Sequence, residues 1–515
     1  SSIPKSTILT VPIFLYTLFI SSRFLIKKIL ALSLVDKSKF KFNNQTSYAI
    51  LGADNIEYEI YEYLKNYKSN FKIKYFIDDN PEFQNRKINN IDVITSKKFI
   101  NNKEKNLLLY VGEKYSKKSN KNEIKKKYGK FVTKIIFTKI INKKIDLKSL
   151  EENILDIDEL IPTSINPKDL KEANKYLNNL TILVTGGGGS IGSELVSQIY
   201  LTNVKKIYVL DNSEYNLFSV KQKLSQLSKY NRNKNLVVEY LLSDISDEDT
   251  VKFISKKKID GVFHAAAYKH VDLVENNIFS GVKNNIFSSY LLCKYLYKIK
   301  KLKFFVLIST DKAVRPKSVM GITKNISEKI VKYYNNFSQA KFYSVRFGNV
   351  INSSGSVIPI FKEQILSGNK VTITNKKATR YFMSIPEAVS LILCSANLKI
   401  NTDVFYFDMG NPIKIYDLAN KIANLLGKKL VKKSKRNDEV EYKIIGLRKG
   451  EKLHEELLIP KNSKLKNTKI KNILYLSDNE KHIYKRLLNF KKLKKLLINK
   501  DKVSLSNYLL ELLKT

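Results

Sequence analysis

Thr181-Ile-Leu-Val-Thr-Gly-Gly-Gly-Gly-Ser-Ile-Gly-Ser-Glu194 is the stretch that decides the fold of this chain. Its apolar half, which ends at Thr185, is rich in β-prone residues and predicts a buried strand. Gly186, Gly189 and Gly192 follow at three-residue spacing, and a helical pattern begins directly after them. Glycine lets a backbone approach a pyrophosphate, and a helix N-terminus favours its negative charge. The stretch therefore predicts a strand, a phosphate-binding turn and a helix.

A carboxylate in the next apolar run supports a bound dinucleotide. Asp211 closes the run Lys206-Ile-Tyr-Val-Leu210, about 20 residues after the last glycine, where an acidic residue holds the adenosine ribose. The same carboxylate would repel a 2′-phosphate, so NAD is favoured over NADP. A glycine-rich turn without a ligand is the alternative, but the combined pattern favours the cofactor.

Strand-like and helix-like segments alternate regularly through a catalytic unit at residues 180–465, which follows a partly helical linker at residues 155–180. This alternation predicts an α/β fold with a doubly wound parallel sheet. The expected strands lie near residues 181–185, 206–210, 236–242, 261–265, 303–309 and 341–346. The rhythm breaks near residues 355–460, where we expect a smaller substrate-capping part. The basic tail at residues 466–515 predicts a solvated amphipathic helix.

Residues 45–150 predict a second, degenerate Rossmann-like unit. Residues 47–51 and 75–79 have the pattern of strands, but Gly52 alone remains of the glycine pattern. Side chains at the other glycine positions would block a pyrophosphate. We therefore expect a structural or regulatory unit rather than a second cofactor site.

Residues 1–30 carry a membrane signal. The stretch from residue 6 to residue 22 has no charged residue. Its length is near the lower limit of about 17 residues for a helix that spans a membrane. Arg23 and five lysines up to Lys41 follow, and they predict a cytoplasmic location for everything downstream. We expect an N-terminal transmembrane helix in the cytoplasmic (inner) membrane. Because the chain starts at Ser1 rather than Met, we also expect that this membrane region is truncated.

The charge balance is extreme, with 92 Lys and Arg against 48 Asp and Glu and a net charge of +44. Such a charge can indicate nucleic acid or an anionic membrane as a partner. The lysines are spread along a chain rich in Asn and Ile, which favours compositional drift, so no nucleic-acid partner is predicted. The two cysteines and four histidines do not cluster as a disulfide framework or a metal site, and no metal is expected.

The end of the strand near residues 303–309 carries the candidate catalytic groups. Thr310, Asp311 and Lys312 lie there, and the carboxyl ends of parallel strands face the ligand crevice. They would place a hydroxyl, a carboxylate and an amine beside the nicotinamide. The alternative is that Thr310 and Asp311 cap the following turn.

Met320 and Lys324 lie four residues apart on the next helix and therefore point the same way. Short-chain dehydrogenases carry Tyr-x-x-x-Lys here, in which the lysine holds the nicotinamide ribose and lowers the pKa of the phenol. Met320 cannot exchange a proton. Either the site is inactive or another residue provides the acid-base chemistry, and the intact Thr310, Asp311 and Lys312 favour the second.

Seven segments resemble the membrane-anchored nucleotide-sugar 4,6-dehydratases of polysaccharide and glycan biosynthesis, which are extended short-chain dehydrogenase/reductase proteins. They are Thr185–Glu194, His264–Glu275, Ile308–Lys324, Arg346–Val350, Thr379–Ala388, Asp408–Gly410 and Gly446–Glu456. The wording Ser-Thr-Asp-Lys-Ala-Val followed by Met-Gly-x-x-Lys is specific to this group, and its long, membrane-bound members share Met in place of Tyr. The resemblance implies UDP-N-acetylglucosamine as the substrate, NAD as the cofactor and a homo-oligomer.

The resemblance also implies a reaction. Hydride leaves sugar C4 for NAD, the C5 proton and the C6 hydroxyl are eliminated, and hydride returns to C6, giving a UDP-4-keto-6-deoxy sugar. Lys312 would be the base at C5 and Asp311 the acid for the C6 hydroxyl. Thr310 would bind the C4 oxygen and Lys324 the ribose. Lys312 would need a depressed pKa, which desolvation and the nearby Lys324 could supply.

Further binding residues are expected along the same edge of the sheet. Asp244 could hold the adenine amino group, and three consecutive alanines could let the nicotinamide ribose pass close to the backbone. The expected cofactor residues are Gly186, Gly189, Ser190, Ile191, Gly192, Asp211, Ser213, Asp244, Ile245, Ala265, Ala266, Ala267 and Lys324. The expected substrate residues are Lys269, His270, Asn349, Arg380, Arg448 and Glu451. The two arginines suit diphosphate oxygens, although either could form a structural salt bridge instead.

Two other functions share the predicted cofactor. A nucleotide-sugar C4 epimerase uses the same first step, but it needs no acid and base at C5 and C6, so Asp311 and Lys312 argue against it. A non-catalytic cofactor-binding regulator is suggested by Met320 and opposed by the same two residues. The leading prediction is a lyase that dehydrates UDP-N-acetylglucosamine.

Overall fold

The computed structural model describes most of the chain after residue 164. It covers residues 165–457, 465–476 and 489–514, apart from 232, 234, 352, 354, 427, 437 and 438, together with parts of 47–145. The predicted membrane segment at residues 1–30 and the first part of the predicted linker lie outside the described residues. Among the helices that are described, none is both long and apolar enough to span a bilayer.

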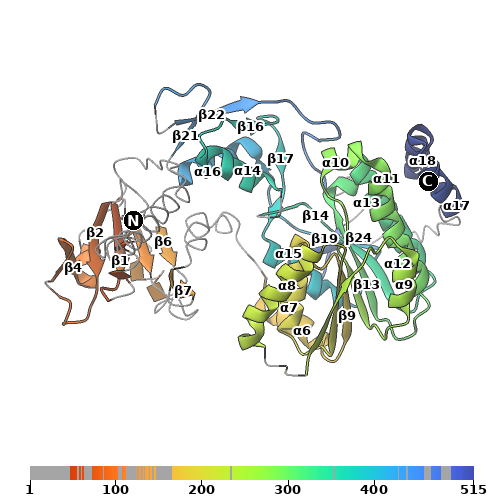
Figure 1. Ribbon diagram of the computed structural model, residues 1–515, viewed down its shortest axis with the longest axis horizontal. Coiled ribbons are helices and arrows are strands. Elements are labelled where there is room, and N and C mark those ends of the chain that lie inside the picture. Colours follow the sequence, from red (N-terminus) through yellow and green to blue (C-terminus); the bar gives the residue numbers. More distant parts are fainter. Residues whose placement is uncertain are drawn as a thin grey trace, which may run out of the picture.

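In the described chain, nine strands form the main sheet, in the order β11-β10-β9-β12-β13-β14-β19-β24-β23 (Figure 1). The strands are β9 (Thr181–Thr185), β10 (Lys206–Asp211), β11 (Val237–Leu242), β12 (Gly261–His264), β13 (Phe304–Thr310), β14 (Lys341–Phe347), β19 (Val404–Phe407), β23 (Leu465–Asn467) and β24 (Ile473–Leu476). All pairs from β11 to β19 are parallel, and the pairs that involve β24 are antiparallel. The predicted parallel sheet is confirmed, and each predicted strand lies within two residues of its observed bounds.

Helices cover both faces of this sheet, as parallel strands joined by crossover helices require. The first face carries α6 (Pro167–Tyr176), α7 (Ser190–Tyr200), α8 (Glu214–Leu227) and α15 (Ile385–Ala396). The second carries α9 (Glu248–Ser255), α11 (Ile278–Val282), α12 (Ser288–Leu296) and α13 (Val319–Asn335). Because α6 packs into the first core, residues predicted as a linker belong in part to the catalytic unit.

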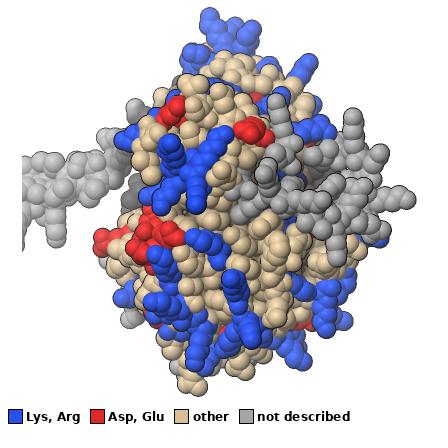
Figure 2. Space-filling model, turned by 90° about the vertical axis from the view of Figure 1, so that its right-hand side faces the viewer, with Lys and Arg blue, Asp and Glu red and all other residues tan. Residues whose placement is uncertain are grey.

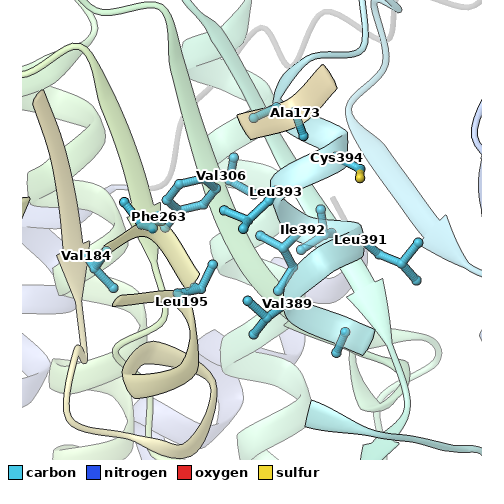
Figure 3. Packing of buried hydrophobic residues seen from close by; sticks show 14 of the residues in the cluster. Ala173, Val184, Leu195, Phe263, Val306, Val389, Leu391, Ile392, Leu393 and Cys394 are labelled. Carbon is cyan, nitrogen blue, oxygen red and sulfur yellow. The ribbon is translucent and has the colours of Figure 1, made fainter. Parts of the chain in front are cut away.

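Figure 3 shows how α15 fills the first core. Val389 and Leu393 of this helix pack with Leu195 of α7 and Phe263 of β12, and all four are fully buried. The helix is apolar around most of its circumference, which is the pattern of a buried helix rather than a surface one. It therefore belongs to the main core, although it lies inside the region predicted to cap the substrate.

The remaining elements of that region form a smaller lobe, drawn above the sheet in Figure 1. The lobe packs α14 (Val357–Leu366) and α16 (Ile415–Leu425) around β16 (Val371–Ile373), β21 (Lys429–Val431) and β22 (Glu439–Ile444). Two separate strand pairs lie in the same region of the chain: β15 (Asn349–Val350) with β18 (Phe382–Met383), and β17 (Thr379–Arg380) with β20 (Ile413–Lys414). The lobe is thus built from two segments of the chain, one before α15 and one after β19.

The C-terminal tail differs from the prediction of a solvated helix. Its first residues form β23 and β24 at the sheet edge, and α17 (Phe490–Ile498) and α18 (Lys502–Lys514) pack on the second core. Leu493 and Leu505 are fully buried, and the Phe490 ring stacks on Tyr290 at 3.4 Å between centroids. The many lysines of the tail made its apolar residues hard to recognise in the sequence. In the structure these residues pack against the second core.

A separate sheet near the N-terminus has the order β3-β4-β2-β1-β5-β6 in the described residues. Its strands are β1 (Ser47–Leu51), β2 (Lys72–Ile77), β3 (Lys87–Ile88), β4 (Ile91–Ile94), β5 (Leu107–Val111) and β6 (Lys134–Phe137), and all pairs except β3–β4 are parallel. Gly52 keeps a positive φ of 103°, but Glu57 packs against it, 2.8 Å from where a Cβ atom would lie. A carboxyl at this turn opposes a pyrophosphate there, so a structural or regulatory role remains our prediction.

Candidate active site

The turn after β9 has the geometry of a phosphate cradle. Gly186 has a φ of 62°, and a Cβ atom on it would lie 2.6 Å from the backbone of Ala266. A Cβ atom on Gly192 would lie 1.9 Å from the carbonyl oxygen of Gly186. Both positions therefore require glycine, and Ser190 begins α7 directly after the turn. The positive end of this helix dipole is suited to an anion.

Asp211 is fixed at the end of β10, beside the turn. Its two carboxylate oxygens accept hydrogen bonds from the backbone N–H groups of Gly188, at 2.9 Å, and Ser213, at 3.0 Å. Ser213 in turn caps α8. At the end of β11, the Oδ1 atom of Asp244 accepts from the backbone N–H of Ser246 at 2.8 Å. Asp211 and Asp244, which we predicted to bind the ribose and the adenine, thus lie at the carboxyl ends of two neighbouring strands.

A cavity of about 980 Å³ opens between the turn, the strand ends and the smaller lobe. It brings together most of the predicted residues: Gly186, Gly189, Ser190, Ile191, Gly192, Ala265, Ala267, Lys269, His270, Thr310, Lys312, Lys324, Asn349, Arg380, Arg448 and Glu451. Five predicted cofactor residues are not on the described cavity wall: Asp211, Ser213, Asp244, Ile245 and Ala266. A cavity of this size can hold more than one small ligand.

Lys312 is the centre of a polar cluster at the end of β13. Its Nζ atom donates to the Oδ1 atom of Asp311 at 3.0 Å and to the Oδ1 atom of Asn349 at 3.0 Å. The Oε1 atom of Glu455 lies 3.6 Å from the same nitrogen. Thr310 donates its hydroxyl to Asp311 at 2.8 Å. Asp311 itself is fully buried and is not among the residues of the described cavity wall.

The expected depression of the Lys312 pKa is wrong for this structure. Burial lowers the pKa of Lys312, but the negative charges of Asp311 and Glu455 outweigh burial and raise it above its ordinary value. These charges hold the ammonium in its protonated form. The sequence could not show this balance, because Glu455 approaches Lys312 only in the folded chain.

Lys324 has the depressed pKa instead. It lies on α13, buried on the cavity wall, and burial lowers its pKa from 10.5 to about 8, with partial opposition from Glu328. Met320 is buried on the same wall one helical turn earlier. The helix is held at its start by the Ser318 hydroxyl, which accepts from the N–H of Gly321 at 3.1 Å. The predicted Met-x-x-x-Lys pair therefore faces the cavity.

The predicted phosphate-binding arginines differ in environment. Arg380 is buried, with Nη2 at 2.7 Å from Glu451 and Nε at 3.9 Å from Glu455. Arg448 lies on the cavity rim with a side chain that is 58% exposed, 4.0 Å from Asp272. Arg380 thus lines the cavity and also forms the structural salt bridge that we considered as the alternative to phosphate binding. Arg448 is exposed enough to be accessible to a ligand.

Three residues that the sequence reasoning did not assign support the site. His264 is buried between the hydroxyls of Thr185, at 2.7 Å, and Ser289, at 3.2 Å, and burial lowers its pKa to about 3. Asn285 accepts from the N–H of Tyr268 at 2.8 Å and thereby fixes the loop after β12. Glu455 is the third, on the cavity wall beside Lys312. A signal was available for Glu455, because it lies in the acidic run Glu451-Lys-Leu-His-Glu-Glu456 of a very basic chain.

Comparison with known proteins gives a consistent grouping. The model of a family described as polysaccharide biosynthesis protein matches residues 182–478. The capsular polysaccharide biosynthesis protein CapD of Staphylococcus aureus is 39% identical over 321 residues, which are 62% of this chain and 51% of CapD. The chain therefore spans about half the length of this curated relative.

Two shorter relatives carry different activities in their names. A UDP-N-acetylglucosamine 4,6-dehydratase (inverting) of Campylobacter jejuni is 31% identical over 294 residues, 56% of this chain and 80% of the relative. A UDP-glucose 4-epimerase of Rickettsia bellii is 30% identical over 349 residues, 63% of this chain and 96% of the relative. Among solved structures, Pen from Bacillus thuringiensis has a TM-score of 0.51 and 29% identity, covering 63% of this chain and 99% of Pen.

Proposed function

The chain belongs to the polysaccharide biosynthesis protein family, and from this premise we propose that it is a nucleotide-sugar 4,6-dehydratase. It removes water from UDP-N-acetylglucosamine to give a UDP-4-keto-6-deoxy sugar. The observation that carries the proposal is the position of Lys312 on the wall of the cavity that opens at the glycine turn, bonded to Asp311. An amine and a carboxyl at this place are the groups that an elimination at C5 and C6 requires.

The cofactor of the proposal is NAD, which supplies reversible hydride transfer. The residues present are compatible with it: Gly186, Gly188, Gly189 and Gly192 line the cavity, and Asp211, which would bind the adenosine ribose, accepts from the N–H of Gly188 in this turn. Lys324 would bind the nicotinamide ribose from the cavity wall. A carboxylate at position 211 disfavours the 2′-phosphate of NADP.

The chain's own residues divide the remaining work. Thr310 would bind the C4 oxygen of the sugar, and Lys312 would remove the C5 proton. An acid must also protonate the departing C6 hydroxyl, and the sequence prediction gives this role to Asp311. Lys312 can act as a base only after it loses its own proton, because the folded protein keeps its ammonium between two carboxylates and Asn349.

The substrate would lie across the lobe side of the cavity. Arg448, Arg380 and Lys269 offer cationic donors for the diphosphate. Asn349, His270 and Glu451 line the same cavity and are proposed sugar or phosphate contacts. Attachment to the inner membrane, a cytoplasmic catalytic unit and a homo-oligomeric state stay predictions.

A nucleotide-sugar C4 epimerase is the second candidate, because a relative with that name matches at similar identity. An epimerase also takes hydride from C4, but it has no use for a base at C5. Lys312 on the cavity wall, with Asp311 and Glu455 beside it, favours dehydration.

Incubation of the chain with UDP-N-acetylglucosamine in deuterated water, followed by NMR and mass spectrometry, tests the proposal. We expect loss of one water and deuterium at C5, and Lys312→Ala should abolish both. Formation of the galacto isomer without mass loss would identify an epimerase. An unchanged sugar from a chain that contains NAD would leave a regulatory protein as the better interpretation.

A further inference from the structure

The hairpin of α17 and α18 carries exposed apolar side chains that its packing does not use. Its inward face is already covered, because Leu493 and Leu505 are buried in the second core. Ile498 and Val503 nevertheless flank the turn between the two helices with 70% and 72% of their surface exposed. The next most exposed aliphatic side chain in the described part of the chain, Leu273, is 59% exposed. Burial in the fold therefore does not explain the apolar tip of this hairpin.

The backbone holds the tip in place. Lys500 has a φ of 51°, a left-handed conformation that few residues other than glycine adopt. The carboxylate of Asp501 accepts a hydrogen bond from the backbone N–H of Ser504 at 3.0 Å, which caps the start of α18. Further along, Lys329 of α13 donates to the carbonyl oxygen of Leu512 at 2.9 Å. The tip is therefore joined through α18 to the helix that forms part of the cavity wall.

The tip is also more basic than the chain as a whole. Residues 491–503 contain six lysines and one acidic residue, Asp501, whereas the whole chain has 92 Lys and Arg against 48 Asp and Glu. The carboxylate of Asp501 is engaged in the cap of α18. The exposed lysines nearest to the two apolar side chains are Lys494, Lys495, Lys500 and Lys502. The average composition of the chain does not account for this local excess.

Exposed aliphatic groups with lysines around them fit a lipid surface. The aliphatic groups enter the boundary between headgroups and acyl chains, and the lysines extend to the lipid phosphates. We propose that the tip of the α17–α18 hairpin docks on an anionic phospholipid bilayer, with Ile498 and Val503 inserted and the four lysines bound to headgroups. This contact is separate from the proposed dehydration and from the membrane segment predicted at residues 1–30. Because the tip is joined to α13, it would orient the catalytic unit on the membrane.

Two other partners fit the tip less well. Proteins bind single-stranded nucleic acid through its phosphates and by stacking bases on aromatic or arginine side chains, and residues 491–503 contain neither kind. A specific protein partner needs about 800 Å² of surface on each side, which two aliphatic side chains do not provide. A lipid surface requires only apolar groups at the right depth and positive charge around them.

A single tryptophan at the tip tests the proposal. The chain has no tryptophan, so Ile498→Trp makes the tip the only source of indole fluorescence. The full chain is mixed with vesicles of phosphatidylcholine alone or of phosphatidylcholine with anionic phosphatidylglycerol, both brominated in their acyl chains. Bromine quenches indole only at close range. Since an interfacial helix enters by about 5–10 Å, we expect emission to fall by about half or more with the anionic vesicles and to stay unchanged with the neutral ones.

Matched variants control for position and for charge. Phe218 is 57% exposed on α8, on the other face of the sheet, so the indole of Phe218→Trp should stay unquenched. In the Ile498→Trp chain, Lys494→Gln with Lys495→Gln should raise the lipid concentration for half-maximal quenching by about tenfold or more. Lys432→Gln with Lys433→Gln removes the same charge from two exposed lysines of the smaller lobe and should change it by less than about twofold.

Four results would overturn the proposal. They are an unquenched indole at position 498 with anionic vesicles, equal quenching at positions 498 and 218, equal quenching with neutral vesicles, and equal weakening by both pairs of lysine changes. A shift of the indole emission without vesicles would also overturn it, and would identify nucleic acid if RNA causes the shift or a second copy of the chain if rising protein concentration does. Turnover is not measured, so these results are independent of the proposed dehydration.

Discussion

Gly186 shows how strongly one position can be constrained. Its φ of 62° is unfavourable for other residues, and a Cβ atom would lie 2.6 Å from the Ala266 backbone. We predict that Gly186→Ala lowers the affinity for NAD by roughly tenfold or more, which corresponds to about 1.4 kcal/mol, because the turn must move. Calorimetric titration with NAD measures this.

Gly368 provides a matched control for that prediction. It has a φ of 73° but open space around a Cβ atom, so Gly368→Ala carries the backbone strain without the clash. We expect a loss of about 1–2 kcal/mol in stability and unchanged NAD affinity. Equal NAD affinities for both variants would contradict the assignment of the turn to the cofactor.

Lys324 makes a prediction about pH. Its pKa is lowered from 10.5 to about 8 by burial, so the unfolded chain binds this proton more tightly than the folded one. Stability therefore rises as the pH increases from about 8 to 10.5, and the charged lysine is destabilising below that window. Lys324→Met should raise the free energy of unfolding at pH 7 by on the order of 2–3 kcal/mol. The gain should vanish near pH 10.5.

Urea unfolding at the two pH values, followed by circular dichroism, measures the Lys324 effect. A stabilisation that does not change with pH would mean that packing, not charge, is responsible. The same variant should lose catalytic activity if Lys324 holds the nicotinamide ribose. A more stable but inactive protein is a result that loss of folding cannot mimic.

Arg448 and Arg380 should differ in role, the first in substrate binding and the second also in holding the structure together. Arg448 is 58% exposed on the cavity rim, so Arg448→Ala should raise KM for the UDP-sugar by roughly 10- to 100-fold, the value of one or two charged hydrogen bonds, with little change in kcat. Arg380→Ala removes the cation beside Glu451 and one of the two cations beside Glu455, and it should reduce kcat and stability as well. Steady-state kinetics of both variants test this, and identical effects would refute it.

At the residue scale, the sequence is informative where chemistry is local. The tight turn at Gly186 and the strand end at Asp211 were predicted because both follow from spacing along one β-α-β unit. The raised pKa of Lys312 was not predicted, because it depends on how far Asp311, and then Glu455 from a distant loop, outweigh the burial of Lys312 in the folded chain. The burial of a side chain and the charges around it depend on several secondary-structure elements, so they cannot be predicted from one stretch of sequence.

At the element scale, the parallel strands were predictable because each is a short apolar run between turn residues. The C-terminal tail was not. β24 (Ile473–Leu476) is the second strand from the edge of the sheet and lies in a lysine-rich stretch, and α17 and α18 carry one apolar face each. The high local charge led to the prediction of a solvent-exposed helix. The apolar residues between the lysines instead pack against α12 and α13.

The packing of the tail can be tested by a pair of leucines. Leu493 on α17 is fully buried, and Leu510 on α18 is 51% exposed. We expect Leu493→Ala to lower the free energy of unfolding by about 2–5 kcal/mol and Leu510→Ala by about 0.5 kcal/mol or less. Chemical denaturation of both variants gives the comparison. Equal small effects would restore the interpretation of a solvated tail.

At the scale of the whole molecule, the site lies where the strand order reverses. The chain runs from β9 outward to β10 on one side and to β12 on the other, which is where ligands bind in open α/β sheets. The smaller lobe closes this crevice with Arg380, Glu451 and Glu455. The sequence predicted the crevice from the order of the motifs, but Glu455, the second carboxyl beside Lys312, approaches it only in the folded chain.

The net charge of +44 also has a consequence for a dianionic UDP-sugar. Figure 2 shows Lys and Arg spread over the visible face, with acidic side chains between them, rather than gathered in one patch. A net positive charge attracts an anion, and its field is screened within about 10 Å at 0.1 M salt. We predict that kcat/KM falls several-fold between about 0.05 and 0.5 M salt while kcat stays nearly constant. A salt-independent kcat/KM would show that the positive charge does not assist capture, which leaves compositional drift as its explanation.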